Sequence, residues 1–139
     1  MTALPTTPQG QLLEVLKDKR LVLVDDDEDQ LCILKAYLRN KVAKLESFVS
    51  GVDALQHIKG KDFDLMILDV MMPDCDGWEI YNRMRQEKDF KDMPVIFLSC
   101  LMNEELVRHT DCPSRCAGLP KPVDLDQLMH KMIELLEAD

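Results

Sequence analysis

Five polar side chains of this 139-residue chain each follow a short apolar run, and their types could do chemistry together. They are three carboxylates, a hydroxyl and an ammonium group: Asp25, Asp26, Asp69, Ser99 and Lys121. If the apolar runs are parallel strands, their carboxyl ends meet at one edge of a sheet and these side chains converge there. The sequence therefore predicts a polar site that combines cation binding, a nucleophile and two groups able to hold an anion.

Three carboxylates brought together repel one another, because two like charges ~4 Å apart cost about 4 kcal/mol at an effective dielectric constant of 20. The cluster therefore needs a cation, and carboxylate ligands that leave room for water suit Mg²⁺. One carboxylate could then attack a phosphoryl donor and form an acyl phosphate. Ser99 and Lys121 would hold the new phosphoryl oxygens by hydrogen bond and charge. The alternative is that each aspartate is only a turn residue or a helix cap. That alternative explains any single aspartate better than it explains the whole set.

The elements that must position these groups alternate along the chain. Continuous apolar runs predict strands at residues 21–24, 45–49, 63–68, 95–98 and 117–119. Helical spacing predicts helices at 31–38, 51–59, 77–86 and 103–109, and a last helix that follows a cap at Asp124. Five strand–helix units in series imply an α/β fold. We expect a flavodoxin-like, doubly wound five-stranded parallel sheet of order 2-1-3-4-5 with five flanking helices.

Three of the predicted helices carry an apolar stripe. The stripes are Leu31, Ile33, Leu34, Tyr37 and Leu38 in the first helix, Val52, Leu55 and Ile58 in the second, and Leu125, Leu128, Met129, Met132 and Leu136 in the last. Residues 1–19 are expected to form a tail, short helix or linker, and residues 20–139 a single domain.

Composition excludes several classes of protein. There are 17 Lys and Arg against 26 Asp and Glu, a net charge of −9, which disfavours direct nucleic-acid binding. No apolar run approaches the ~18 residues of a membrane span, and the first residues lack a secretory signal. Five cysteines form no disulfide framework, which favours free thiols and a cytoplasmic location. Three residues able to bind a metal occur close together, at His109, Cys112 and Cys116, but their spacing matches no common zinc finger.

The chain resembles the receiver domain of bacterial two-component response regulators, of the kind found in chemotaxis. The resemblance covers about residues 20–137. It rests on four motifs in the family's order: LVLVDDD at 21–27, LDVMMPDCDG at 68–77, PVIFLS at 94–99 and LPKP at 119–122.

This resemblance implies a role for each site residue. Asp69 matches the phosphoacceptor, Asp26 the direct Mg²⁺ ligand, and Asp25 a ligand that acts largely through water. Met71 matches the position whose backbone carbonyl completes the metal shell, Ser99 the switch residue, and Lys121 the lysine that precedes a proline commonly held in cis. Asp27 is expected to cap a helix or to be solvated rather than to bind the ion. Gly118 departs from the family, which often has an aromatic residue at that position.

The leading hypothesis is a signalling switch and not an enzyme that turns over a metabolite. A sensor histidine kinase or phosphotransfer protein would phosphorylate Asp69. The face built by the fourth helix, the fifth strand and the fifth helix would then change its affinity for an unknown effector protein, with no contact to membrane or nucleic acid. The alternative is an interaction module of the same fold that works without phosphorylation, which Gly118 favours slightly. An aspartyl phosphatase is less consistent with Met71, where such enzymes usually have a second acid.

Overall fold

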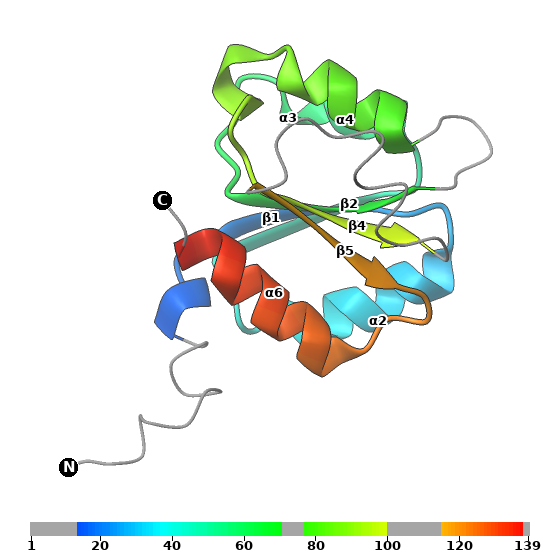
Figure 1. The fold of residues 1–139 in the computed structure, drawn as a ribbon, viewed down its shortest axis with the longest axis vertical. Coiled ribbons are helices and arrows are strands. Elements are labelled where there is room, and N and C mark those ends of the chain that lie inside the picture. The colour runs from blue at the N-terminus through cyan, green and yellow to red at the C-terminus, as the bar shows by residue number, and fades with distance from the viewer. Residues whose placement is uncertain (1–13, 71–76, 100–114, 138–139) are drawn as a thin grey trace.

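A five-stranded, wholly parallel sheet lies at the centre of the computed structural model, which describes residues 14–70, 77–99 and 115–137 (Figure 1). The strands are β1 (Arg20–Val24), β2 (Lys44–Phe48), β3 (Leu65–Asp69), β4 (Val95–Ser99) and β5 (Cys116–Pro120). Their order is β2-β1-β3-β4-β5, with every neighbouring pair parallel. The predicted fold class and strand order are confirmed.

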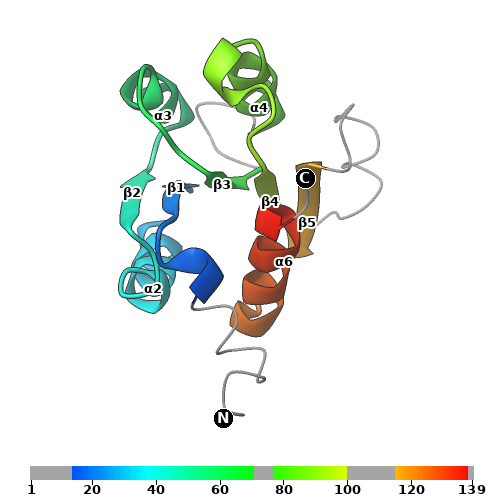
Figure 2. The same cartoon turned by 90° about the vertical axis from the view of Figure 1, so that its left-hand side faces the viewer.

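Helices cover both faces of this sheet, as Figures 1 and 2 show. One face is covered by α3 (Gly51–Ile58) and α4 (Gly77–Arg85), and the other by α2 (Glu28–Leu38) and α6 (Leu125–Glu137). A short 3-10 helix, η2 (Lys88–Phe90), leads from α4 towards β4. The helix expected at 103–109 lies outside the described residues. None of the described helices is long and apolar enough to cross a membrane.

The three central strands β1, β3 and β4 form because most of their residues are apolar on both sides. All five residues of β3 and of β4 are buried. Along β1, Val22 and Val24 join the core under α3 and α4, while Leu21 and Leu23 join the core under α2 and α6. Leu16, from the expected N-terminal segment, is fully buried in this second core.

The apolar stripe predicted for α3 is wrong in part. Gly51, Ala54 and Ile58 are the buried residues of this helix, whereas Val52 is exposed and Leu55 only partly buried. The prediction considered only the large apolar side chains of this helix. The small residues at 51 and 54 are buried instead, because they let the helix lie close to the sheet. The face that packs is therefore rotated away from Val52.

Smaller differences affect the other helices and one strand. Ile33 is 54% exposed, because α2 packs through Leu31, Leu34 and Leu38 instead. In α6, Leu135 is buried, while Leu136 is only partly buried. The strand predicted from residue 63 begins two residues later, at Leu65.

Candidate functional site

The β1–α2 turn positions the first two carboxylates. The backbone N–H of Asp25 donates to the carbonyl oxygen of Phe48 on the neighbouring strand at 3.1 Å. The Asp25 side chain is 1% exposed, and its Oδ1 accepts a hydrogen bond from the backbone N–H of Asp27 at 2.9 Å. Asp26, the next residue, is exposed. One carboxylate thus points into the protein while its neighbour reaches solvent.

Asp69, the last residue of β3, lies beside this turn. It is 1% exposed, and the Nζ of Lys121 stands 2.9 Å from its Oδ1 and 3.8 Å from Oδ2 of Asp25. One ligand atom from each of Asp25, Asp26 and Asp69 lies within 4.8 Å of the others. The convergence of three carboxylates and one ammonium group, predicted from the sequence, is present in the structure.

Ser99 and Lys121 enter the same edge from β4 and from the segment after β5. Ser99 is 3% exposed, and its carbonyl oxygen accepts a hydrogen bond from the backbone N–H of Lys121 at 3.2 Å. The peptide bond between Lys121 and Pro122 is cis, as the family resemblance implied. Met71, proposed to contribute its backbone carbonyl, lies outside the described residues.

Burial and mutual repulsion shift the pKa values of the groups in this cluster. Burial raises the pKa of Asp25 from 3.8 to about 6, and the Asp69 carboxylate adds to the rise, while the Asp27 N–H and Lys121 oppose it. Burial and Asp69 also raise the pKa of Asp26. Burial alone would lower the pKa of Lys121, but its hydrogen bond to Asp69 and the surrounding carboxylates outweigh this and raise it. Lys121 therefore stays charged.

The donor set fits a hard divalent cation. Oδ2 of Asp25 is buried and has no hydrogen-bond partner among the described residues, although Lys121 stands 3.8 Å away. A buried carboxylate oxygen without a hydrogen bond is costly unless a cation or an ordered water contacts it. Three carboxylates carry more negative charge than one lysine neutralises, so a divalent cation is the natural complement.

Gly77 is a site feature that the sequence analysis noted only as part of a motif. Its N–H donates to the carbonyl oxygen of Val70 at 2.8 Å, which brings the first residue of α4 against the end of β3. A Cβ at this position would collide with the carbonyl oxygen of Asp69 and lie 2.7 Å from the Cα of Val70. Glycine is required here because two backbones meet, which one sequence cannot reveal.

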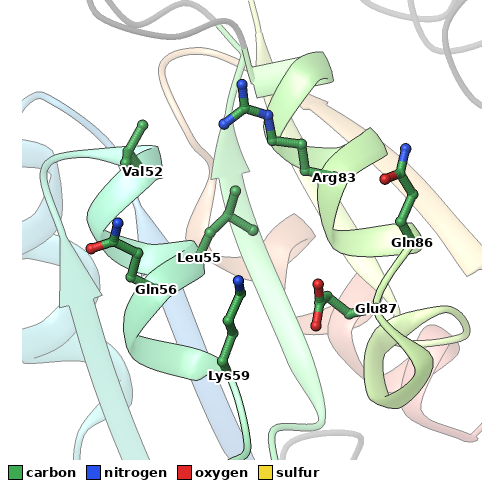
Figure 3. Close-up of a pocket in the computed structure, with 7 residues that line it drawn as sticks. All are labelled: Val52, Leu55, Gln56, Lys59, Arg83, Gln86 and Glu87. Atoms are coloured by element: carbon green, nitrogen blue, oxygen red, sulfur yellow. The ribbon is translucent and has the colours of Figure 1, made fainter.

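A separate concavity is lined by residues of α3 and α4 and of the segments that follow these helices (Figure 3). Its volume is about 380 Å³, and the residues that line it are Val52, Leu55, Gln56, Lys59, Arg83, Gln86 and Glu87. Among the described residues, none of the predicted site lines this groove.

Comparison with known proteins agrees with this geometry. The model of the response regulator receiver domain family matches residues 21–133. Among curated proteins, the response regulator SaeR of Staphylococcus aureus is 33% identical over 84 residues, which are 60% of this chain and 36% of SaeR. The aligned part of this chain thus spans about a third of that relative.

Two solved structures illustrate the likeness in three dimensions. The BeF₃-activated receiver domain of DrrB, a response regulator of Thermotoga maritima, is 26% identical, with a TM-score of 0.73 over 87% of this chain and 99% of that one. The receiver domain of the sensor histidine kinase PA1611 of Pseudomonas aeruginosa, solved with a magnesium ion coordinated in its active site cleft, is 18% identical. Its TM-score is 0.73, over 87% of this chain and 99% of that one.

The family match extends over most of the chain and includes all five residues that the sequence analysis placed at the carboxyl edge of the sheet. Those five residues lie at or just after the ends of β1, β3, β4 and β5, which are neighbours in the strand order. Sequence and structure therefore agree that this chain belongs to the response regulator receiver domain family.

Proposed function

We propose that this domain accepts a phosphoryl group on Asp69 from a sensor histidine kinase or a phosphotransfer protein, in the presence of Mg²⁺. The observation that carries the proposal is the meeting of three carboxylates with Lys121, whose Nζ lies 2.9 Å from Asp69 Oδ1. A buried aspartate in contact with a lysine at the carboxyl edge of a parallel sheet is a nucleophile with a cation already beside it.

Asp25, Asp26 and Asp69 would hold the Mg²⁺, together with the backbone carbonyl of Met71 that the family resemblance implies. The bound ion would supply positive charge to the carboxylates and to the incoming phosphoryl oxygens. The PA1611 receiver, which has a magnesium ion in its active site cleft, supports this assignment. So does the buried Asp25 Oδ2, which has no hydrogen-bond partner among the described residues.

The residues of this chain would act in one displacement at phosphorus. A carboxylate oxygen of Asp69 forms the new O–P bond, and the P–N bond to the histidine of the donor breaks, its electron pair leaving with the imidazole nitrogen. Lys121 is within reach to balance the charge of a phosphoryl oxygen, and the Ser99 hydroxyl can donate a hydrogen bond to another. Each domain accepts one group, so the chemistry is transfer onto itself and not turnover of a substrate.

The output would be a change in protein binding. The surface proposed for this purpose consists of the segment at 103–109, β5 and α6, and its partner is an effector protein rather than nucleic acid or membrane. A population shift between two packings of this surface is enough to change affinity. The proposal places the protein in the cytoplasm, where a kinase domain could reach it.

Intact-mass spectrometry of the full chain tests the proposal. We expect incubation with acetyl phosphate and MgCl₂ to add the mass of one phosphoryl group, and we expect no gain with EDTA or in Asp69→Asn. Asp62→Asn is the matched control, because it makes the same chemical change at a carboxylate that is 96% exposed and outside the site.

The opposite result would favour the alternative function. If neither acetyl phosphate nor a phosphorylated histidine donor domain adds mass to the wild-type chain, the domain does not act as a phosphoacceptor. A phosphorylation-independent interaction module would then be the better description. A gain that persists in Asp69→Asn would also contradict the proposal, because it would place the modification elsewhere.

A further inference from the structure

Asp27 makes hydrogen bonds on two sides, and together they connect helix α2 to the carboxylate cluster. We propose that Asp27 is a positioning residue: by capping α2 it holds the Asp25 carboxylate in the orientation that receives a divalent cation. The inference rests on the proposed function, since it concerns the cation of that site. Asp27 is assigned no part as a ligand.

The side chain of Asp27 fixes its own backbone. Its Oδ1 accepts hydrogen bonds from the backbone N–H groups of Asp29 at 3.0 Å and Gln30 at 3.2 Å, and its carbonyl oxygen accepts one from Leu31 at 3.1 Å. The residue has the extended conformation of a helix N-cap, with φ −86° and ψ 106°. These three bonds restrain Asp27, whose own backbone N–H belongs to the peptide unit between Asp26 and Asp27.

That peptide unit carries the N–H that holds Asp25. It donates to Oδ1 of Asp25 at 2.9 Å, so a change in the conformation of Asp27 would release this oxygen. The bond also distinguishes the two carboxylate oxygens of Asp25. Oδ1 is occupied, while Oδ2 is buried and has no hydrogen-bond partner among the described residues. The cap therefore determines which oxygen is available to a cation or to its water shell.

We expect Asp27 to affect cation binding through the geometry that it imposes on Asp25 and not through its own charge. The Asp27 carboxylate is exposed, where its charge is screened by water, and its bonds are those of a cap. Asparagine caps helices as well as aspartate does and carries no charge, whereas alanine does not cap. The two substitutions therefore separate the cap from the charge.

Isothermal titration of the full chain with MgCl₂ tests the inference. We expect Asp27→Ala to weaken Mg²⁺ binding by about three- to tenfold. The free energy of losing a helix N-cap corresponds to a change in Kd of that size. Asp27→Asn should bind within about twofold of the wild type. Ser50→Ala is the matched control, because the Ser50 hydroxyl caps a different helix, α3, by accepting from Asp53 N–H at 3.3 Å. It should leave Mg²⁺ affinity unchanged while lowering the melting temperature to a similar degree.

Each contrary result has a distinct meaning. Equal weakening in Asp27→Asn and Asp27→Ala would show that charge acts, and equal weakening in Ser50→Ala would show a general effect of stability; either overturns the inference. Unchanged affinity in every variant overturns it as well and leaves the proposed function intact. Absence of Mg²⁺ binding by the wild type would overturn both. If Asp27→Ala does not fold, Asp27→Gly removes the same hydrogen-bond acceptor at lower cost to the helix and should weaken Mg²⁺ binding in the same direction, to a smaller degree.

Discussion

At the scale of single residues, we expect the Asp25 carboxylate to determine the pH dependence of the proposed site, because it is buried beside a second carboxylate. Burial raises its pKa to about 6, and the neighbouring Asp69 contributes to the rise. A protonated carboxyl group does not hold a cation, so in the proposed site Mg²⁺ would compete with a proton at this residue. We expect Mg²⁺ affinity to fall by about tenfold between pH 7.5 and pH 5, because the ionised fraction falls by that factor one unit below the pKa.

Calorimetric titration with MgCl₂ at the two pH values measures this effect. Asp25→Asn is the control: it should bind Mg²⁺ more weakly and lose most of the dependence on pH in this range. Equal affinities of the wild type at both pH values would contradict the assignment of a raised pKa to a residue that holds the ion, whether directly or through its water shell.

At the scale of elements, helix α4 packs against the end of β3, the strand that ends in the proposed phosphoacceptor Asp69. Gly77 is the first residue of α4, and its backbone packs on the backbone of Asp69 and Val70 so closely that a methyl group would overlap them. Neither backbone can move aside without displacing a strand or a helix. We expect Gly77→Ala to lower the free energy of unfolding by roughly 1–3 kcal/mol, the usual cost of overpacking. Phosphorylation by acetyl phosphate should also slow, because Asp69 would shift.

Gly60→Ala provides the comparison for this substitution. Gly60 has φ +74° and no atom within 4 Å of a Cβ built there, so alanine would meet backbone strain but no clash. Urea unfolding should show a lower free energy of unfolding in both variants, whereas the phosphorylation rate should fall in Gly77→Ala alone. A normal rate in Gly77→Ala would show that the contact with Asp69 is structural and does not position the nucleophile.

The strands and helices also show which features of the fold and of the candidate site can be predicted from a single sequence. Asp69 and Ser99 could be placed because each follows an apolar run buried on both faces, and in parallel sheets the carboxyl ends of strands hold the site. The packed face of α3 could not be predicted, since Gly51 and Ala54 are buried by the close approach of the helix to the sheet and not by their hydrophobicity. The requirement for glycine at 77 likewise arises from a contact between distant backbones.

At the scale of the whole molecule, the buried apolar side chains of the described residues form two cores, one on each face of the sheet, and the buried carboxylates lie at one edge. The folded-state pKa of Asp25, about 6, lies above its ordinary value of 3.8, so the folded protein binds the extra proton between these values. Stability contributed by this group is therefore fully present below about pH 4 and is lost as pH rises through 6. At pH 7 the metal-free fold bears a cost of roughly 2–3 kcal/mol.

A cation should relieve that cost and stabilise the whole domain. An ion that binds only the folded state at a hundred times its Kd adds about 2.7 kcal/mol, which for a chain of this size corresponds to a rise of roughly 6–10 °C in Tm. Thermal melts at pH 7.5 with EDTA or saturating MgCl₂ measure the shift. Asp25→Asn, which removes the buried charge, should melt higher than the wild type in EDTA and respond little to MgCl₂. If this variant instead melts lower than the wild type in EDTA, the buried carboxylate stabilises the metal-free fold. The acidic edge would then be a structural feature rather than a site whose unfavourable charge is offset by binding a cation.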